Sequence, residues 1–303
     1  MSAMTSLFRV VLTALTMITI FTGLAFAQNV GMPVDKQTGF QTPVTGVMEF
    51  IVDFEGALNY LIIFITLFVF ALLAYVMVKF RASKNQEPSK RTHNTLLEVA
   101  WTAIPVLILM VMAIPSFQLL WDQKITPDGE REYAYAGKLP APEVTIKAIG
   151  IQWAWEFEYP DEEELAFSSY MKADDELEEG EPRLLSVDNQ VVVPVNTTVR
   201  LLVTSSDVLH AFAMPAFGVK VDAVPGRINE TWFNVKKEGI YYGQCSEICG
   251  KDHAFMPIAV RVVSKDIYNQ WLNVAKVDID EAGTLLKQLV AENQIKTERL
   301  ARR

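Results

Sequence analysis

Two long apolar runs stand near the front of the chain, and shorter alternating runs follow them. Residues 57–78 and 99–121 contain no charged side chain over 22 and 23 positions, respectively. At about 1.5 Å of rise per helical residue, each run spans about 33 Å, which is enough to cross the hydrocarbon core of a bilayer. The pattern therefore predicts two transmembrane helices, over about residues 55–80 and 96–121.

A third apolar run occupies the start of the sequence. Arg9 precedes an apolar stretch, residues 10–23, and the small-residue pattern "AFA" ends at residue 27. A basic, then an apolar, then a small-residue region is typical of a secretory signal peptide. We predict that residues 1–27 are removed, with a further membrane helix as the alternative. The N-terminal segment and the hairpin then occupy residues 28–121.

Basic side chains gather in the link between the two predicted helices. One acid, Glu87, stands there against five bases: Lys79, Arg81, Lys84, Lys90 and Arg91. Residues 28–56, on the other side of the first helix, hold a single base, Lys36. Because cytoplasmic loops carry an excess of Lys and Arg, the link is predicted to be cytoplasmic and everything after Trp121 to lie outside. Together with a signal peptide, this indicates a bacterial inner membrane and a periplasmic outer domain.

The outer part of the chain changes to a period of two. Short runs such as "VTIKAIGIQWAWEFEY" and "NQVVVPVNTTVRLLVTS" are separated by Pro, Gly and Asn turns. They predict an antiparallel, all-β sandwich or barrel, which we place at residues 122–265. Residues 266–303 carry Leu, Val and Ile at helical spacing and predict an amphipathic terminal helix. The tract 159–182 holds ten acids and one base. It predicts a solvated loop whose field would also attract a basic partner.

Both cysteines of the chain lie in one stretch, "YYGQCSEICGKDHAFMP". Cys245 and Cys249 are followed by His253 and Met256, and His210 lies 35 residues before the first cysteine. Two cysteines in an oxidising compartment pair by default as a disulfide, and two thiolates with two imidazoles also suit a structural zinc ion. The thioether favours copper, because thiolate, thioether and imidazole form the ligand set of cupredoxin-type electron-transfer centres.

The number of cysteines predicts the number of copper ions. A mononuclear blue-copper site uses one cysteine, so the second indicates two ions that share both thiolates. Each copper would take both bridging sulfurs and one imidazole. Two weak axial positions then remain, for Met256 and for a loop carbonyl, that of Glu247.

With this hairpin and this set of Cys, His and Met residues, the chain closely resembles subunit II of haem-copper cytochrome c oxidases of the alphaproteobacterial and mitochondrial kind. The resemblance runs from the first membrane helix to about Val263 and includes "GIQWAWEFEYP" and "SSDVLHAFAMPAFGVKVDAVPGRINETWF". It implies a cupredoxin-like domain behind a two-helix hairpin. It also implies a binuclear CuA centre with these copper ligands: His210, Cys245, Glu247 through its carbonyl, Cys249, His253 and Met256.

The same resemblance implies the function of a redox subunit. The chain would take electrons from cytochrome c at CuA and pass them to haem a in subunit I of a proton-pumping oxidase. Oxygen reduction, with CuB, would occur in subunit I. The expected partners are subunit I, other oxidase subunits, cytochrome c and the lipid membrane, and no nucleic acid is expected.

Further roles are implied residue by residue. Trp153 matches the exposed tryptophan that receives the electron, although many members have an aromatic residue where this chain has Ala154. From the residues alone, Trp153 also fits a core stripe with Trp155, Phe157 and Tyr159, because these positions share one strand face. Acids at the positions that dock a basic cytochrome c in the family are Glu158, Asp188 and Asp207.

Two glutamates carry both a structural and a functional interpretation. The carboxylate of Glu247 matches the family's magnesium ligand at the boundary with subunit I, and the alternative is a solvent-facing loop side chain. Glu98 matches the glutamate at the mouth of the family's proton channel. It also completes a capping box that begins at Thr95. His93, in the predicted cytoplasmic turn, is given no metal role.

Other classes share parts of this pattern. A membrane-anchored copper chaperone or thiol oxidoreductase also has a C-x3-C and a distant histidine, but in a thioredoxin-like βαβ context. A quinol oxidase subunit II has the same architecture without the copper ligands. The copper domain of a nitrous oxide reductase shares the ligands without the hairpin.

Overall fold

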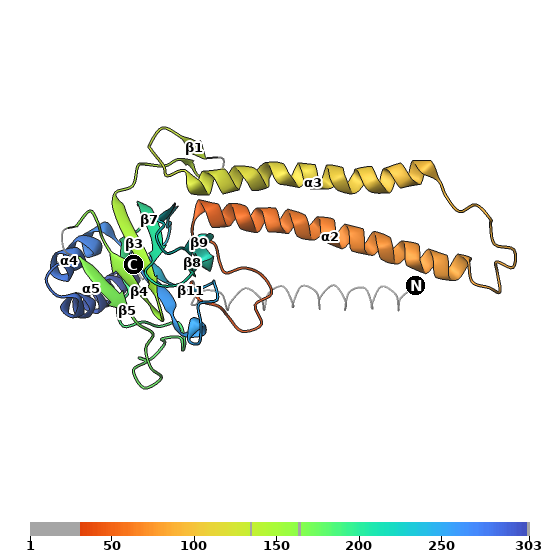
Figure 1. The fold of residues 1–303 in the computed structure, drawn as a ribbon. Coiled ribbons are helices and arrows are strands. Elements are labelled where there is room, and N and C mark those ends of the chain that lie inside the picture. The colour runs from red at the N-terminus through yellow and green to blue at the C-terminus, as the bar shows by residue number, and fades with distance from the viewer. Residues whose placement is uncertain (1–30, 134, 163–164, 302–303) are drawn as a thin grey trace.

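The computed structural model describes residues 31–133, 135–162 and 165–301. A hairpin of two long helices, α2 (Gly46–Lys79) and α3 (Thr95–Lys124), extends from one side of a β domain, and helices α4 and α5 lie on its opposite side (Figure 1). The predicted signal peptide falls outside the described residues. Both helices of the hairpin are long and apolar enough to cross a membrane, and their apolar windows are 0% buried within the chain.

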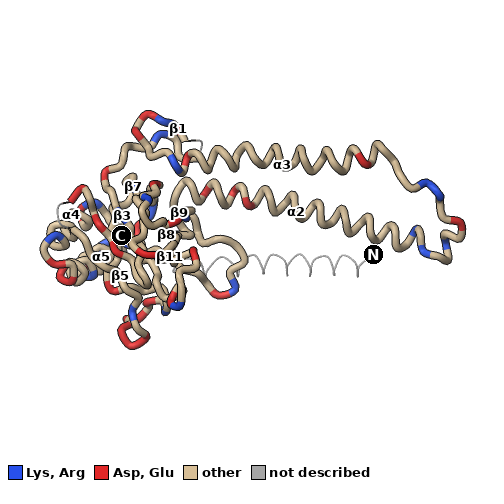
Figure 2. The backbone as a smooth tube through the Cα atoms, viewed as in Figure 1, with Lys and Arg blue, Asp and Glu red and all other residues tan. Residues whose placement is uncertain are grey.

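Helix α2 begins about ten residues before the predicted start. The Thr45 hydroxyl caps it by accepting from the Met48 amide. The added turns carry acids, so the apolar run misses them, and two of their side chains, Val47 and Met48, are buried beside the β domain. Figure 2 shows acids at this domain end of α2 and the basic side chains in the distant turn between α2 and α3.

Helix α3 is capped one residue earlier than the sequence predicts. Asn94, not Thr95, is the N-cap, and its side-chain oxygen accepts from the Leu96 and Leu97 amides. Glu98 still returns a hydrogen bond to the cap, because its carboxylate accepts from the Asn94 amide at 3.3 Å. Asn is a better N-cap than Thr. With Asn94 as the cap, the mutual hydrogen bonds of the capping box begin one position earlier than predicted. Pro105 and Pro115 lie inside the continuous helix, as expected for a membrane span.

The β domain is a sandwich of two five-stranded sheets. The first has the order β10-β7-β3-β4-β5 and the second the order β6-β12-β11-β8-β9. Strands of the first sheet are β3 (Val144–Ile151), β4 (Ala154–Glu158), β5 (Ala166–Ser169), β7 (Thr198–Ser205) and β10 (Asn229–Asn234). Strands of the second are β6 (Val191–Pro194), β8 (His210–Met214), β9 (Val219–Ala223), β11 (Gly239–Cys245) and β12 (Pro257–Val263). A separate ribbon joins β1 (Glu132–Tyr133) to β2 (Gly137–Lys138).

The sheets are mixed, whereas the sequence predicts antiparallel ones. β3 runs parallel to β7, and β6 runs parallel to β12. Alternation within a strand reports only which face is buried, and it carries no information on the direction of the neighbouring strand. The period of two itself is confirmed in β3, where buried and half-buried side chains alternate over all eight residues. Buried apolar side chains of both sheets meet in one core, including Ile146, Phe157, Leu201, Phe212, Tyr241 and Val260.

The C-terminal segment is helical but forms two helices in place of the predicted one. They are α4 (Lys265–Ala275) and α5 (Ile279–Ala301). The break comes at Asp278, whose carboxylate accepts from the amides of Asp280 and Glu281 and so caps the second helix. Trp271 of α4 is buried beside Tyr159, with ring centroids 5.7 Å apart.

The hairpin is joined to the β domain by buried polar contacts. Asp122, near the end of α3, pairs with Arg131 at 3.0 Å. The indole N–H of Trp232, on β10, donates to the Asp122 carbonyl at 2.9 Å. The Trp232 contact ties the first sheet to the end of α3, and the Arg131 contact ties the segment before β1 to the same place.

Candidate metal centre

The candidate ligands meet at one end of the sandwich because several strands begin or end there. His210 is the first residue of β8 and Cys245 the last residue of β11. These strands pair antiparallel, with Cys245 opposite Phe212, so the two residues lie at the same end of the second sheet. The loop 246–256 leaves this end and returns to it, and Met256 directly precedes β12.

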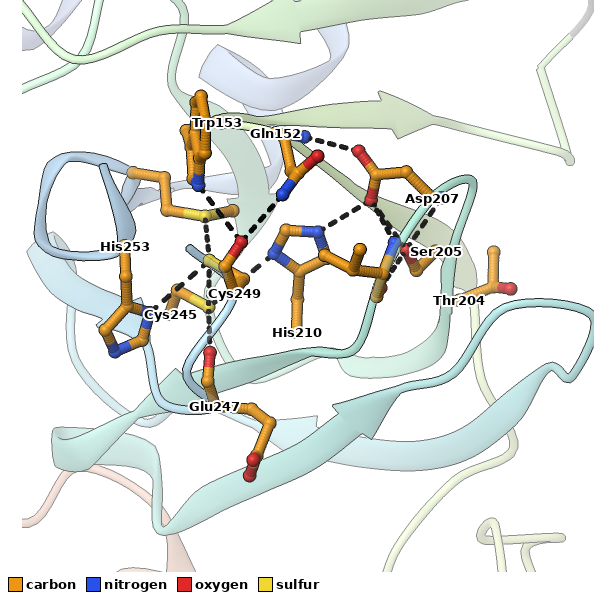
Figure 3. Close-up of polar contacts among 12 residues, drawn as sticks. Gln152, Trp153, Thr204, Ser205, Asp207, His210, Cys245, Glu247, Cys249 and His253 are labelled. Carbon is orange, nitrogen blue, oxygen red and sulfur yellow. Dashed lines mark hydrogen bonds and ion pairs between the residues drawn. The ribbon is translucent and has the colours of Figure 1, made fainter. Parts of the chain in front are cut away.

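The two thiols form the centre of the cluster (Figure 3). Their sulfur atoms lie 3.9 Å apart and are not bonded to each other. Cys245 Sγ lies 3.8 Å from Nδ1 of His210 and 3.3 Å from the Glu247 carbonyl oxygen. Cys249 Sγ lies 3.4 Å from Nδ1 of His253 and 3.5 Å from the Met256 sulfur. Each sulfur thus faces one imidazole and one weaker donor.

All six predicted ligands are therefore brought together. His210, Cys245 and Cys249 are buried, and their donor atoms lie within 4.8 Å of one another. Met256 is 1% exposed, whereas His253 is half-buried, with its Nδ1 beside the Cys249 sulfur. The Glu247 side chain is exposed and points away from the sulfurs while its carbonyl faces them.

The two thiols differ in pKa because their surroundings differ. Burial raises the pKa of Cys245, but hydrogen bonds to the His210 ring and to the loop backbone outweigh burial and lower this pKa to about 6. Burial and the nearby Cys245 thiolate raise the pKa of Cys249 to about 12. Burial lowers the pKa of His210, yet its contacts with Cys245 and Asp207 raise it overall. Without a metal, Cys245 is therefore the more acidic of the two thiols.

This donor set fits a pair of copper ions. Two sulfurs at bridging distance, each with its own imidazole, supply equivalent positions for two soft metal ions. The thioether and the carbonyl then lie beside different sulfurs. A tetrahedral zinc site would use four of these six groups and leave the buried thioether without a role.

Trp153 packs against the same core as the aromatic stripe to which its spacing assigned it, but it is less buried than the other members. Trp155, Phe157 and Tyr159 are at most 1% exposed, whereas Trp153 comes before β4 and is partly exposed. Its indole N–H donates to the Cys249 carbonyl at 3.2 Å. Gly250, with φ of 124°, makes room for the ring, because a Cβ there would lie 3.0 Å from it. The partly exposed tryptophan therefore touches the cluster backbone.

Three further residues shape the site, and the sequence did not single them out for this purpose. A carboxylate oxygen of Asp207 lies 2.9 Å from Nε2 of His210. The Gln152 side chain donates to the Cys249 carbonyl at 2.8 Å. Gly150 leaves space for the His210 ring, because a Cβ there would lie 2.7 Å from it. The D-x-x-H spacing of Asp207 and His210 was a usable signal, but the other two contacts join distant strands.

Comparison with known proteins assigns the family. Residues 33–119 match the family model for the transmembrane domain of cytochrome c oxidase subunit II, and residues 144–263 match the model for its periplasmic domain. The probable cytochrome c oxidase subunit 2 of Rickettsia bellii is 46% identical over 253 residues, which cover 84% of this chain and 88% of that protein. This chain belongs to the cytochrome c oxidase subunit II family.

A second relative agrees with this placement. The Rickettsia prowazekii probable cytochrome c oxidase subunit 2 is 48% identical over 240 residues, covering 79% of this chain and 72% of that protein. A crystal structure of the periplasmic domain of subunit II (CoxB) of Bradyrhizobium japonicum is 56% identical, covers 46% of this chain and 99% of that one, and gives a TM-score of 0.44. As a subunit II, the chain is a membrane component of an oxidase with other subunits, and its family implies copper.

The acids of this subunit II that were predicted to dock a partner lie in different surroundings. Asp207 contacts His210, as described above. Glu158 pairs with Lys147 at 2.9 Å, and Asp188 accepts from the Tyr170 amide at 2.7 Å. Their docking role stays a prediction.

The acidic tract is partly neutralised within the fold. Lys172 pairs with Glu181 at 2.8 Å, and Arg183 pairs with Asp174 at 2.9 Å. Lys287 of α5 pairs with Glu178. The field available to steer a basic partner is therefore weaker than the count of acids suggests.

Proposed function

We propose that this subunit II accepts electrons from cytochrome c and passes them towards haem a in subunit I, where oxygen is reduced. The six-residue cluster at the end of the sandwich is the observation that carries the proposal. His210, Cys245, Cys249, His253, Met256 and the Glu247 carbonyl would hold two copper ions. The bound copper pair supplies one-electron oxidation and reduction shared between two ions.

The protein's own residues prepare the site for metal. The thiol of Cys245 loses its proton near neutral pH, because its pKa is lowered to about 6. The thiol of Cys249 keeps its proton in the metal-free chain, so binding of both sulfurs must release it. Met256, at 1% exposed, closes the inner side of the cluster against water. The sandwich thus presents a largely formed set of ligands, which keeps rearrangement on electron transfer small.

Electrons would arrive through Trp153. This ring is the partly exposed tryptophan that donates a hydrogen bond to the backbone of a ligand, Cys249. A cytochrome c bound over the ring would have a short contact path to the cluster. Glu158, Asp188 and Asp207 would attract the basic face of that partner, and such rim charges affect the association rate more than the affinity.

The remaining predicted roles place the chain in its complex. The exposed Glu247 carboxylate, turned away from the sulfurs, would bind magnesium at the boundary with subunit I. Glu98, one turn inside α3, would stand at the mouth of a proton channel while also closing the helix cap. The basic turn between α2 and α3 would face the cytoplasm and the β domain the periplasm of a bacterial inner membrane.

The first test is the copper content and the electron paramagnetic resonance spectrum of the purified full chain. We expect two coppers per chain that share one unpaired electron, seen as a seven-line pattern or its unresolved equivalent. His253→Ala should lose this signal, and the matched control His93→Ala should keep it. One copper or none in the wild type, with Cys245 and Cys249 oxidised to a disulfide, would reject the proposal in favour of thiol chemistry.

A further inference from the structure

The loop between β7 and β8 places a carboxylate between the cluster and the turn that carries Trp153. One oxygen of Asp207 lies 2.9 Å from Nε2 of His210. The other accepts from the backbone amide of Gln152 at 2.7 Å. The first oxygen also accepts from the Val208 amide at 2.6 Å and from the Ser205 hydroxyl at 3.2 Å. Both oxygens are therefore held by the protein.

The contact with His210 determines how the ring presents itself to the cluster. The ring is 0% exposed, and its two nitrogens face opposite ways, Nε2 towards Asp207 and Nδ1 towards the Cys245 sulfur. A carboxylate that accepts from Nε2–H keeps the proton on that nitrogen and leaves the Nδ1 lone pair free for a metal. It also increases the basicity of the ligating nitrogen.

The contact with Gln152 fixes the neighbouring tryptophan. The turn at residues 152–153 is held on one side by Asp207, through the Gln152 amide. It is held on the other side by the Cys249 carbonyl, which accepts from both the Gln152 side chain and the Trp153 indole. One carboxylate thus anchors a candidate ligand and, across the two sheets, the turn that carries the candidate electron acceptor.

We propose that Asp207 is a positioning residue that orients His210 and fixes the Gln152–Trp153 turn over the metal centre. The proposal rests on the proposed copper function of the same site. It differs from the docking role implied by family resemblance, because a docking acid acts on the partner and leaves the metal centre unchanged. Asp207 is expected to tune the centre itself.

The sign of the effect follows from charge. A carboxylate 2.9 Å from the imidazole stabilises the more positively charged, oxidised form of the bound metal. Neutralising it in Asp207→Asn should therefore raise the reduction potential. Removing the oxygens in Asp207→Ala should also free the ring, and loss of such an outer contact typically lowers metal affinity by roughly 10- to 100-fold.

The experiment compares Asp207→Asn, Asp207→Ala and Glu158→Gln in the purified oxidase. Glu158→Gln is the matched control, since it also removes one predicted docking charge but touches Lys147 and not a candidate ligand. Three quantities are measured: copper affinity by competition with a chelator, the reduction potential with the paramagnetic resonance spectrum, and the salt dependence of KM for cytochrome c. The near-isosteric Asn variant covers the case in which the Ala variant fails to fold.

We expect both Asp207 variants to weaken copper binding and to change the spectrum, with a higher potential for Asp207→Asn. Glu158→Gln should change only KM and its salt dependence. Asp207→Asn with wild-type copper affinity, spectrum and potential but a raised KM would overturn the proposal and leave a docking acid. A wild type without a copper pair would instead reject the underlying function, so the two failures are distinguishable.

Discussion

Strand β3 packs closely against the His210 ring, and this packing can be tested with one methyl group. In Gly150→Ala, the new Cβ would lie 2.7, 2.8 and 3.0 Å from the Cδ2, Cγ and Cβ atoms of His210. Carbon atoms pack favourably at about 3.5–4.0 Å, so either the ring or the strand must move by roughly 1 Å. The ring has no free direction, because it is buried and both of its nitrogens are engaged.

The expected cost is that of overpacking a core. Inserting one methyl group into such a site typically destabilises a protein by about 1–3 kcal/mol. The φ angle of Gly150 is not in the left-handed region, so the cost is steric and not a backbone preference. The displaced ring should also weaken copper binding and change the paramagnetic resonance spectrum.

The assay is urea unfolding of the full chain in detergent, followed by tryptophan fluorescence, with the copper spectrum recorded in parallel. Gly283→Ala is the matched control, because it makes the same substitution inside α5, where no atom beyond the adjacent helix backbone lies within 4 Å of the new Cβ. It should stabilise the chain by about 0.5–1 kcal/mol, the usual effect of Gly to Ala in a helix. If Gly150→Ala unfolds like the wild type and keeps its copper spectrum, then the strand does not position His210.

Three other side chains can be tested separately. Trp153→Phe should keep the copper spectrum and slow electron uptake from cytochrome c; unchanged kinetics would leave this ring a packing role. Glu98→Gln should lower oxidase turnover with copper loading intact, while Glu87→Gln, in the basic turn that precedes α3, should not; equal turnover would leave Glu98 as a cap. Glu230 pairs with Arg200 at 2.7 Å, and this hydrogen bond lowers the Glu230 pKa. Glu230→Gln should therefore reduce the free energy of unfolding at pH 7 by about 1 kcal/mol or less, since both side chains are partly exposed. That difference should vanish as the pH falls through the lowered pKa, and a difference that persists there would refute the assignment.

The hydrophobic pattern was sufficient for the parts of the fold that are decided locally. An uncharged run long enough to cross a bilayer has few alternatives to a membrane helix, and both spans were predicted from this property. The period of two located strands such as β3 and β7, because it depends only on which face of a strand is buried. It missed β5, which lies inside the acidic tract predicted to be a solvated loop. Cys245, Cys249, His253 and Met256 were recognisable for a similar reason, since one loop carries them within a few residues.

Local pattern failed where a choice depended on distant segments or on competition between neighbours. The parallel pairing of β3 with β7 joins residues that are 55 positions apart, and the local pattern of neither strand specifies the direction of its partner. The cap of α3 and the break before α5 depend on which of several adjacent polar side chains accepts hydrogen bonds from the free backbone amides. Asn94 does so at α3, and Asp278 does so at α5.

The membrane hairpin, the β character of the outer domain and the kinds of atoms available for a metal all follow from local sequence. How those atoms are held depends on the packing of distant segments. The sequence predicted Asp207 only as a docking acid, whereas in the fold it contacts His210 and Gln152. Gly150 had no assigned role in the sequence, and in the fold the His210 ring packs against it. Donor chemistry belongs to each residue type, whereas the orientation of a ring depends on contacts between strands that meet only after the two sheets have packed.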